Sequence, residues 1–124
     1  MAKGKEKHQR RLDAINLLGK DLARRAGRSC ELCDERAGCR PYDLEPDKAP
    51  ELQHLILLCG SCRELMDRPG QKPADHMRFL ANHCWSDRVP VQAAVQRLLE
   101  PLQTDWATEA LDNLAMMRGA AALD

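Results

Sequence analysis

The sequence predicts a small, mainly α-helical protein with a short β element of zinc-ribbon or treble-clef-like type. Two Cys-x-x-Cys pairs, the first at Cys30 and Cys33 and the second at Cys59 and Cys62, have the ligand type and pair spacing of a four-thiolate metal site. Outside these pairs, apolar residues recur at steps of three and four, which is typical of amphipathic helices.

A chain of 124 residues is expected to form one compact domain. Within it we expect three segments. Residues 1–11 form a flexible basic arm, residues 12–72 form a helix and the four-cysteine zinc ribbon, and residues 73–124 form a helical segment packed on the ribbon. The 19 basic and 19 acidic residues cancel, which argues against attraction of the whole protein to nucleic acid or to an anionic membrane.

Residues 1–11 show no apolar periodicity and are predicted to be flexible. Leu12, Ile15, Leu18 and Leu22 then mark the buried stripe of a first helix. Gly27 is expected to cap that helix at its carboxyl end, immediately before the first cysteine pair.

The segment between the two pairs is predicted to contribute two strands. Residues 41–44 suit a short edge strand, where proline is tolerated, and residues 54–58 form a compact apolar run that suits a buried strand. Beyond the second pair, residues 63–66 predict a short helix and residues 74–84 a longer one. Two further helices follow, one with Pro90 in its first turn and one capped by Thr104 and ended by Gly119.

Two stretches resemble PhnA-like zinc-ribbon proteins, a family named after an alkylphosphonate-utilisation operon. The first is made of three segments that surround the cysteine pairs: Leu18-Gly19-Lys20-Asp21-Leu22-Ala23-Arg24-Arg25, Ser29-Cys30-Glu31-Leu32-Cys33 and Leu58-Cys59-Gly60-Ser61-Cys62. The second joins Asp75-His76 to Trp85-Ser86 and Val89-Pro90-Val91-Gln92. The resemblance covers most of residues 12–115 and implies a zinc-binding ribbon followed by helices, but little about activity. Met77 departs from the tryptophan expected there.

Cys30, Cys33, Cys59 and Cys62 are the predicted metal ligands, and Zn²⁺ is the expected ion. Four thiolates leave no open coordination position, so the site is expected to stabilise the fold and not to catalyse. A redox dithiol and a rubredoxin-type iron site use the same cysteines and stay open as alternatives. Cys39 is expected to be a thiol in a polar loop, and Cys84 a small core residue.

The function predicted from these observations is that of a non-catalytic accessory or interaction module. The first alternative is a degenerate nuclease of HNH type, because His54 lies five residues before the third cysteine. However, Tyr42-Asp43-Leu44 stands where that fold needs a general-base histidine, and Arg63 replaces its metal-binding histidine. His76 and His83 have no catalytic partners in the sequence.

The second alternative is weak, non-specific nucleic-acid contact through the basic residues of the arm, which are Lys3, Lys5, Lys7, Arg10 and Arg11. An unknown protein partner and a homodimer through the leucine-rich carboxyl-terminal helices also stay open. The sequence shows neither a signal peptide nor a membrane-spanning run, so a cytoplasmic location is expected, where thiols stay reduced.

Overall fold

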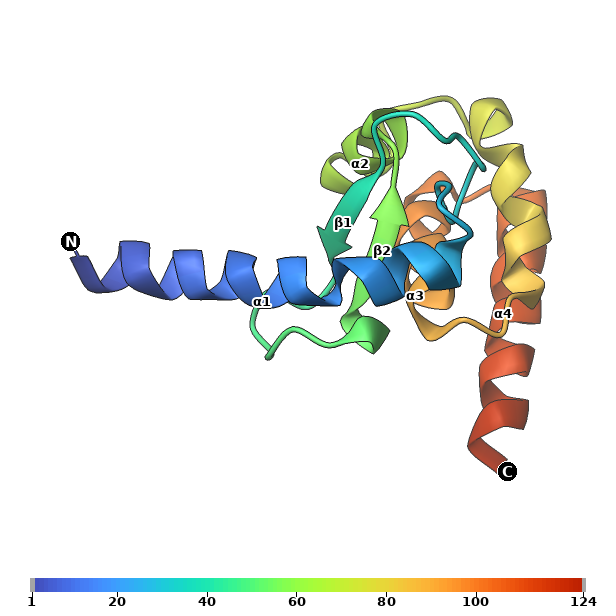
Figure 1. The fold of residues 1–124 in the computed structure, drawn as a ribbon. Helices are drawn as coiled ribbons and strands as arrows, with labels where there is room; N and C mark the ends of the chain where they lie inside the picture. The colour runs from blue at the N-terminus through green and yellow to red at the C-terminus, as the bar shows by residue number, and fades with distance from the viewer. Residues whose placement is uncertain (1, 124) are drawn as a thin grey trace. The chain divides into compact units, whose positions relative to one another are not determined.

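The computed structural model describes the backbone of residues 2–123 and the side chains of residues 4–119. The protein is mainly helical and has one small sheet of two antiparallel strands, which confirms the predicted class at that level (Figure 1). The chain divides into two compact units, residues 1–59 and 60–124.

The first unit begins with helix α1, Ala2–Ala26. Residues 2–11 were expected to be flexible, but they form the first turns of this helix, which extend beyond the sheet (Figure 1). The difference has a physical reason, because lysine, glutamate, glutamine and arginine are good helix formers even without an apolar stripe. Met1 and the side chains of residues 1–3 lie outside the described part of the chain.

Arg11, the last residue of the expected arm, fixes α1 to the loop after the first strand. Its Nε donates to Asp43 Oδ2 over 2.8 Å. Its Nη1 and Nη2 donate to the carbonyl oxygens of Lys48 and Glu45 over 2.7 and 2.8 Å. These three acceptors are more than 30 positions away in the sequence, so helical periodicity could not reveal them.

The carboxyl end of α1 is closed by a Schellman motif around Gly27. The Arg28 N–H donates to Ala23 O over 2.8 Å, and the Gly27 N–H donates to Arg24 O over 3.3 Å. Gly27 has φ +65°, a left-handed conformation that glycine adopts without steric strain. The predicted cap is therefore confirmed, and the chain turns directly into the first cysteine pair.

The sheet pairs β1, Arg40–Asp43, with β2, Leu55–Leu58, so both expected strands are present. The register places Arg40 opposite Leu58 and Asp43 opposite Leu55. All four residues of β2 are buried, while β1 is the more exposed edge. Helix α1 packs against the sheet (Figure 1), and a small core joins the two elements through Leu22, Ala26, Leu55 and Leu57.

The second unit contains α2, Gly60–Asp67, a succession of 3₁₀ turns, Ala74–Trp85, and the helices α3, Val89–Leu99, and α4, Asp105–Leu123. The 3₁₀ segment, α3 and α4 pack against one another. Thr104 accepts a hydrogen bond from the Ala107 N–H over 3.3 Å, as expected of a helix cap. The apolar side chains buried in this unit include Met66, Met77, Leu80, Cys84, Val91, Val95, Leu98, Ala107, Ala110 and Leu114.

Two details of the second unit differ from expectation. Residues 74–85 have 3₁₀ instead of α-helical geometry, which places side chains three positions apart on one side and lets Met77 and Leu80 be buried together. Helix α4 continues through Gly119 to Leu123, because a glycine inside a helix weakens it without breaking it. None of the described helices is both long and apolar enough to cross a membrane.

Two glycines, Gly19 inside α1 and Gly27 directly after it, give opposite predictions for replacement by alanine. Gly27→Ala puts a Cβ on a left-handed residue and should lower the free energy of unfolding by about 1 kcal/mol. Gly19→Ala, in the helix interior with open space around its Cβ, should raise it by roughly 0.5–1 kcal/mol. Urea unfolding of the metal-loaded variants measures both. Equal effects of the two substitutions would contradict the cap assigned to Gly27.

Candidate metal centre

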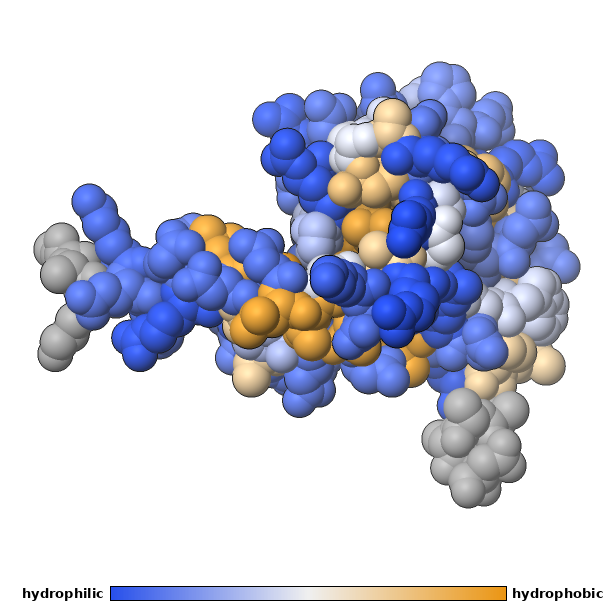
Figure 2. Space-filling view, in the orientation of Figure 1, coloured by the Kyte–Doolittle hydropathy of each residue, from blue (hydrophilic) through white to orange (hydrophobic). Residues whose placement is uncertain are grey.

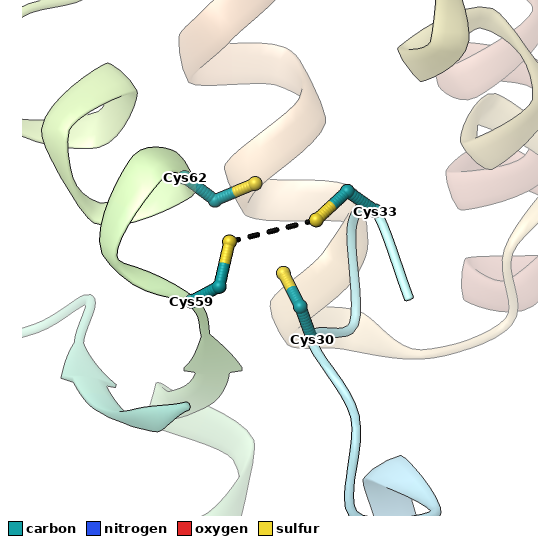
Figure 3. Close-up of side chains that lie close together, drawn as sticks. All are labelled: Cys30, Cys33, Cys59 and Cys62. Atoms are coloured by element: carbon teal, nitrogen blue, oxygen red, sulfur yellow. Dashed lines mark hydrogen bonds between the residues drawn. The ribbon is translucent and has the colours of Figure 1, made fainter. Parts of the chain in front are cut away.

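The four predicted ligands converge. The sulfur atoms of Cys30, Cys33, Cys59 and Cys62 all lie within 4.8 Å of one another. Their side chains point toward a common centre (Figure 3), and the Sγ atoms of Cys33 and Cys59 are 3.5 Å apart. Cys33 is exposed and the other three are buried. The sequence therefore identified the complete cluster.

Local backbone geometry positions each pair. In the first pair, the Asp34 N–H donates to Cys30 O over 3.0 Å, and the Cys30 N–H donates to Glu35 O over 2.8 Å. Asp34 has φ +67°, a left-handed conformation that aspartate tolerates better than most residues. In the second pair, Cys59 directly follows β2 and Cys62 lies in the first turn of α2. The turn after Cys30 and the first helical turn of α2 thus bring the two sulfurs of each pair close together.

The cluster fits a tetrahedral ion in size and chemistry. A Zn–S bond of about 2.3 Å in tetrahedral geometry separates neighbouring sulfurs by roughly 3.8 Å. This value lies between the 3.5 Å that separates the sulfurs of Cys33 and Cys59 and the 4.8 Å within which all four sulfurs lie. In the described part of the chain, the grouped ligand atoms are these four sulfurs alone, with no histidine or carboxylate among them. Such a set can hold one metal ion and leaves no coordination position for water or substrate.

Glu31, inside the first pair, is a buried acid with a specific set of partners. Its carboxylate accepts two hydrogen bonds from Arg25, from Nε over 3.0 Å and from Nη2 over 2.9 Å. The Leu57 N–H of β2 donates to the same carboxylate over 2.8 Å. The Glu31 side chain is 0% exposed, so these bonds replace the water that the charge would otherwise require.

The Arg25 guanidinium completes this network. Nη1 donates to Leu52 O over 2.7 Å, and Nη2 donates to Leu55 O over 2.6 Å. The Glu31 N–H in turn donates to Leu57 O over 2.9 Å. Arg25 and Glu31 therefore join α1, the first cysteine pair and the strand that leads to the second pair.

Sequence reasoning missed this network. Helical periodicity and cysteine spacing indicate no partner for Arg25 or Glu31. The available signal was the position of Glu31 between Cys30 and Leu32, both of which are buried. An acid enclosed in this way needs a cationic partner, and Arg25 lies only six positions earlier.

The other two cysteines lie outside the cluster. Cys39 is half-buried, and its Sγ donates to Glu35 O over 3.0 Å. Burial raises the pKa of the Cys39 thiol, and the negative charge of Cys30 and Cys59 raises it further. Cys84 is 1% exposed, which confirms it as a core residue, and burial raises the pKa of its thiol as well. Both thiols are therefore kept protonated.

The histidines singled out in the sequence are not part of the cluster. His54 ends the short 3₁₀ turn Leu52–His54. Its Nδ1 is 3.3 Å from Ala49 O, and its Nε2 is 3.9 Å from a carboxylate oxygen of Glu51. His76 is exposed and His83 half-buried in the 3₁₀ segment of the second unit. In the described part of the chain, none of them joins the grouped metal ligands.

The chain matches no protein-family model and no curated protein, and its structure matches no solved structure. The cysteine cluster and its supporting network are therefore the features from which a function can be inferred.

Arg25→Met should destabilise the metal-loaded protein by about 3 kcal/mol, because it leaves the Glu31 carboxylate buried without its counter-charge. Arg24→Met is the matched control. Arg24 is 82% exposed and its ion pair with Asp21 is 3.8 Å long, so that change should stay within roughly 0.5 kcal/mol. Urea unfolding at neutral pH measures the difference. Similar losses in the two variants would contradict the role assigned to Arg25.

Proposed function

We propose that the protein is a zinc-binding accessory or interaction module without catalytic activity. One structural Zn²⁺ is held by Cys30, Cys33, Cys59 and Cys62. The observation that supports this proposal is the closed set of four sulfurs, which suits zinc and offers substrate no open position. Thiolate ligands also favour zinc over magnesium, calcium or manganese, which prefer oxygen.

The proposed ion holds the fold together. It would join the turn after α1 to the end of β2 and the start of α2, where the described chain has only short elements. Binding energies of structural zinc sites are on the order of 10 kcal/mol, which is comparable to the stability of a whole domain. Function in this proposal resides on the surfaces that the ion positions, and the partner recognised there is a protein.

We also propose that the two-strand element is a zinc ribbon of the PhnA-like type. The motifs around both cysteine pairs and the Trp85-Ser86 and Val89-Pro90-Val91-Gln92 segments support it. A cytoplasmic location follows from the same chemistry, since reducing compartments keep the cysteines available for metal.

A nuclease of HNH type is the less favoured alternative. It requires a metal-binding histidine directly after the second Cys-x-x-Cys pair, whereas the described cluster contains cysteines alone. His54 Nδ1 is 3.3 Å from Ala49 O and its Nε2 is 3.9 Å from a Glu51 carboxylate oxygen, and within the described residues no histidine belongs to the grouped metal ligands. DNA cleavage that depends on Mg²⁺ or Mn²⁺ and is lost in His54→Ala would favour the nuclease over the accessory module.

The accessory function is tested by affinity capture with zinc-loaded protein and with Cys59→Ser. The variant should lose its metal and its native fold, and a specific partner should be lost with them. Cys39→Ser is the matched control, because it removes a thiol outside the cluster and should retain both metal and partner.

Metal content and near-ultraviolet circular dichroism are measured on the same samples. A Cys59→Ser protein that folds normally without metal would contradict the structural role of zinc. A partner captured equally by all three proteins would contradict the proposed dependence of the interaction on the metal-held surfaces.

A further inference from the structure

The outer side of the last turns of α1 carries a shallow basic hollow that the metal centre does not use. Its volume is about 510 Å³, and it is lined by Gly19, Lys20, Ala23, Arg24 and Arg28. Gly19 and Ala23 are one helical turn apart and project little side chain, so they form the floor. The three longer side chains around them are all cationic and exposed, and no carboxylate lines the hollow.

These three charges are largely free to bind a ligand. Arg24 is 3.8 Å from an Asp21 oxygen, and both side chains are exposed, so that pair contributes little. Within the described chain, no carboxylate forms an ion pair with Lys20 or Arg28. The inward arginines of the same helix, Arg11 and Arg25, differ clearly, because each has a carboxylate and two carbonyl oxygens as acceptors.

The helix dipole accounts for only part of this arrangement. It favours cations in the last turn, where Arg24 lies, but its effect falls off beyond that turn. Lys20 lies one turn earlier, and Arg28 lies past the end of the helix with φ +61°. The backbone N–H of Arg28 is fixed to Ala23 O, two residues before Cys30. The three cations therefore extend from fixed backbone positions along one surface.

Toward the amino terminus the same side of α1 is mixed in charge, because Glu6 and Asp13 lie on it together with Arg10. Arg10, Leu17 and Arg24 follow at steps of seven and share one side of the helix, with Leu17 84% exposed between the two arginines. The exposed charges from residue 4 to residue 28 are six cations against three carboxylates, a net of +3: Lys5, Lys7, Arg10, Lys20, Arg24 and Arg28 against Glu6, Asp13 and Asp21. Strongly hydrophilic side chains cover the carboxyl-terminal part of α1 (Figure 2).

We propose that this outer surface of α1 binds the phosphate backbone of double-stranded nucleic acid. Lys20, Arg24 and Arg28 make the central contacts in this proposal. Helix α1 contains no aromatic residue on which an unpaired base could stack, which favours a duplex over a single strand. Cations without base-reading side chains give affinity that is independent of sequence and sensitive to salt. This activity goes beyond the accessory function and does not depend on the identity of its protein partner.

The test is fluorescence anisotropy with the zinc-loaded full-length protein and a labelled DNA duplex of about 20 base pairs, long enough to offer several phosphates. If three phosphates are neutralised, the logarithm of the association constant should fall with the logarithm of salt concentration with a slope of roughly −2.7. The triple variant Lys20→Gln, Arg24→Gln, Arg28→Gln should bind at least about tenfold more weakly in low salt and show a shallower slope.

The control removes three exposed charges elsewhere, with Arg36→Gln, Lys48→Gln and Arg97→Gln. It should bind the duplex within about twofold of the unmodified protein, because only the total charge changes. Metal content and urea unfolding establish that both triple variants are folded.

Three results would overturn the proposal. One is the absence of salt-dependent binding to the duplex. Another is equal weakening in the two triple variants, which would mean that net charge and not the α1 surface governs binding. The third is tighter binding of poly-glutamate than of the duplex, which would assign the basic surface to an acidic protein partner.

Discussion

Convergence of four cysteine sulfurs within 4.8 Å of one another is the constraint on which the two Cys-x-x-Cys pairs depend. Four thiolates at this spacing repel one another strongly unless a cation lies between them. The short elements nearby, with four residues in each strand, offer little else to fix the ends of the two turns. A metal ion would remove this repulsion and fix both pairs, which is why we propose a structural role for it.

The Arg25–Glu31 pair extends this constraint from the cysteines to the elements around them. A buried carboxylate inside the first Cys-x-x-Cys pair holds the pair against β2 through the Leu57 N–H, and Arg25 connects both to α1. The basic surface of α1 begins directly beside this network, since Arg24 and Arg25 are neighbours that project about 100° apart around the helix axis. One arginine stabilises the site, and the other is free to bind a ligand. The helix thus links the cysteine cluster to the proposed nucleic-acid contact.

Features fixed by local chemistry were predictable from the sequence. The Cys-x-x-Cys spacing identified all four grouped cysteines, Gly27 identified the end of α1, and the apolar run before Cys59 identified β2. Features fixed by distant partners were not predictable. The contacts of Arg11 were missed because its acceptors lie around Asp43, and the contacts of Glu31 were missed because its counter-ion comes from α1 and its third donor from β2. Hydrophobic periodicity indicates which side of a helix or strand is buried, but it does not indicate which polar groups form hydrogen bonds or ion pairs with each other.

The central claim is that a closed set of four sulfurs holds one zinc ion. X-ray absorption at the zinc edge, measured on protein purified without added metal chelator, tests this claim most directly. The account predicts one zinc per chain with four sulfur neighbours at about 2.3 Å and no nitrogen or oxygen in the inner shell. A histidine nitrogen or a water oxygen among the ligands would contradict it, because an open or mixed site could take part in catalysis.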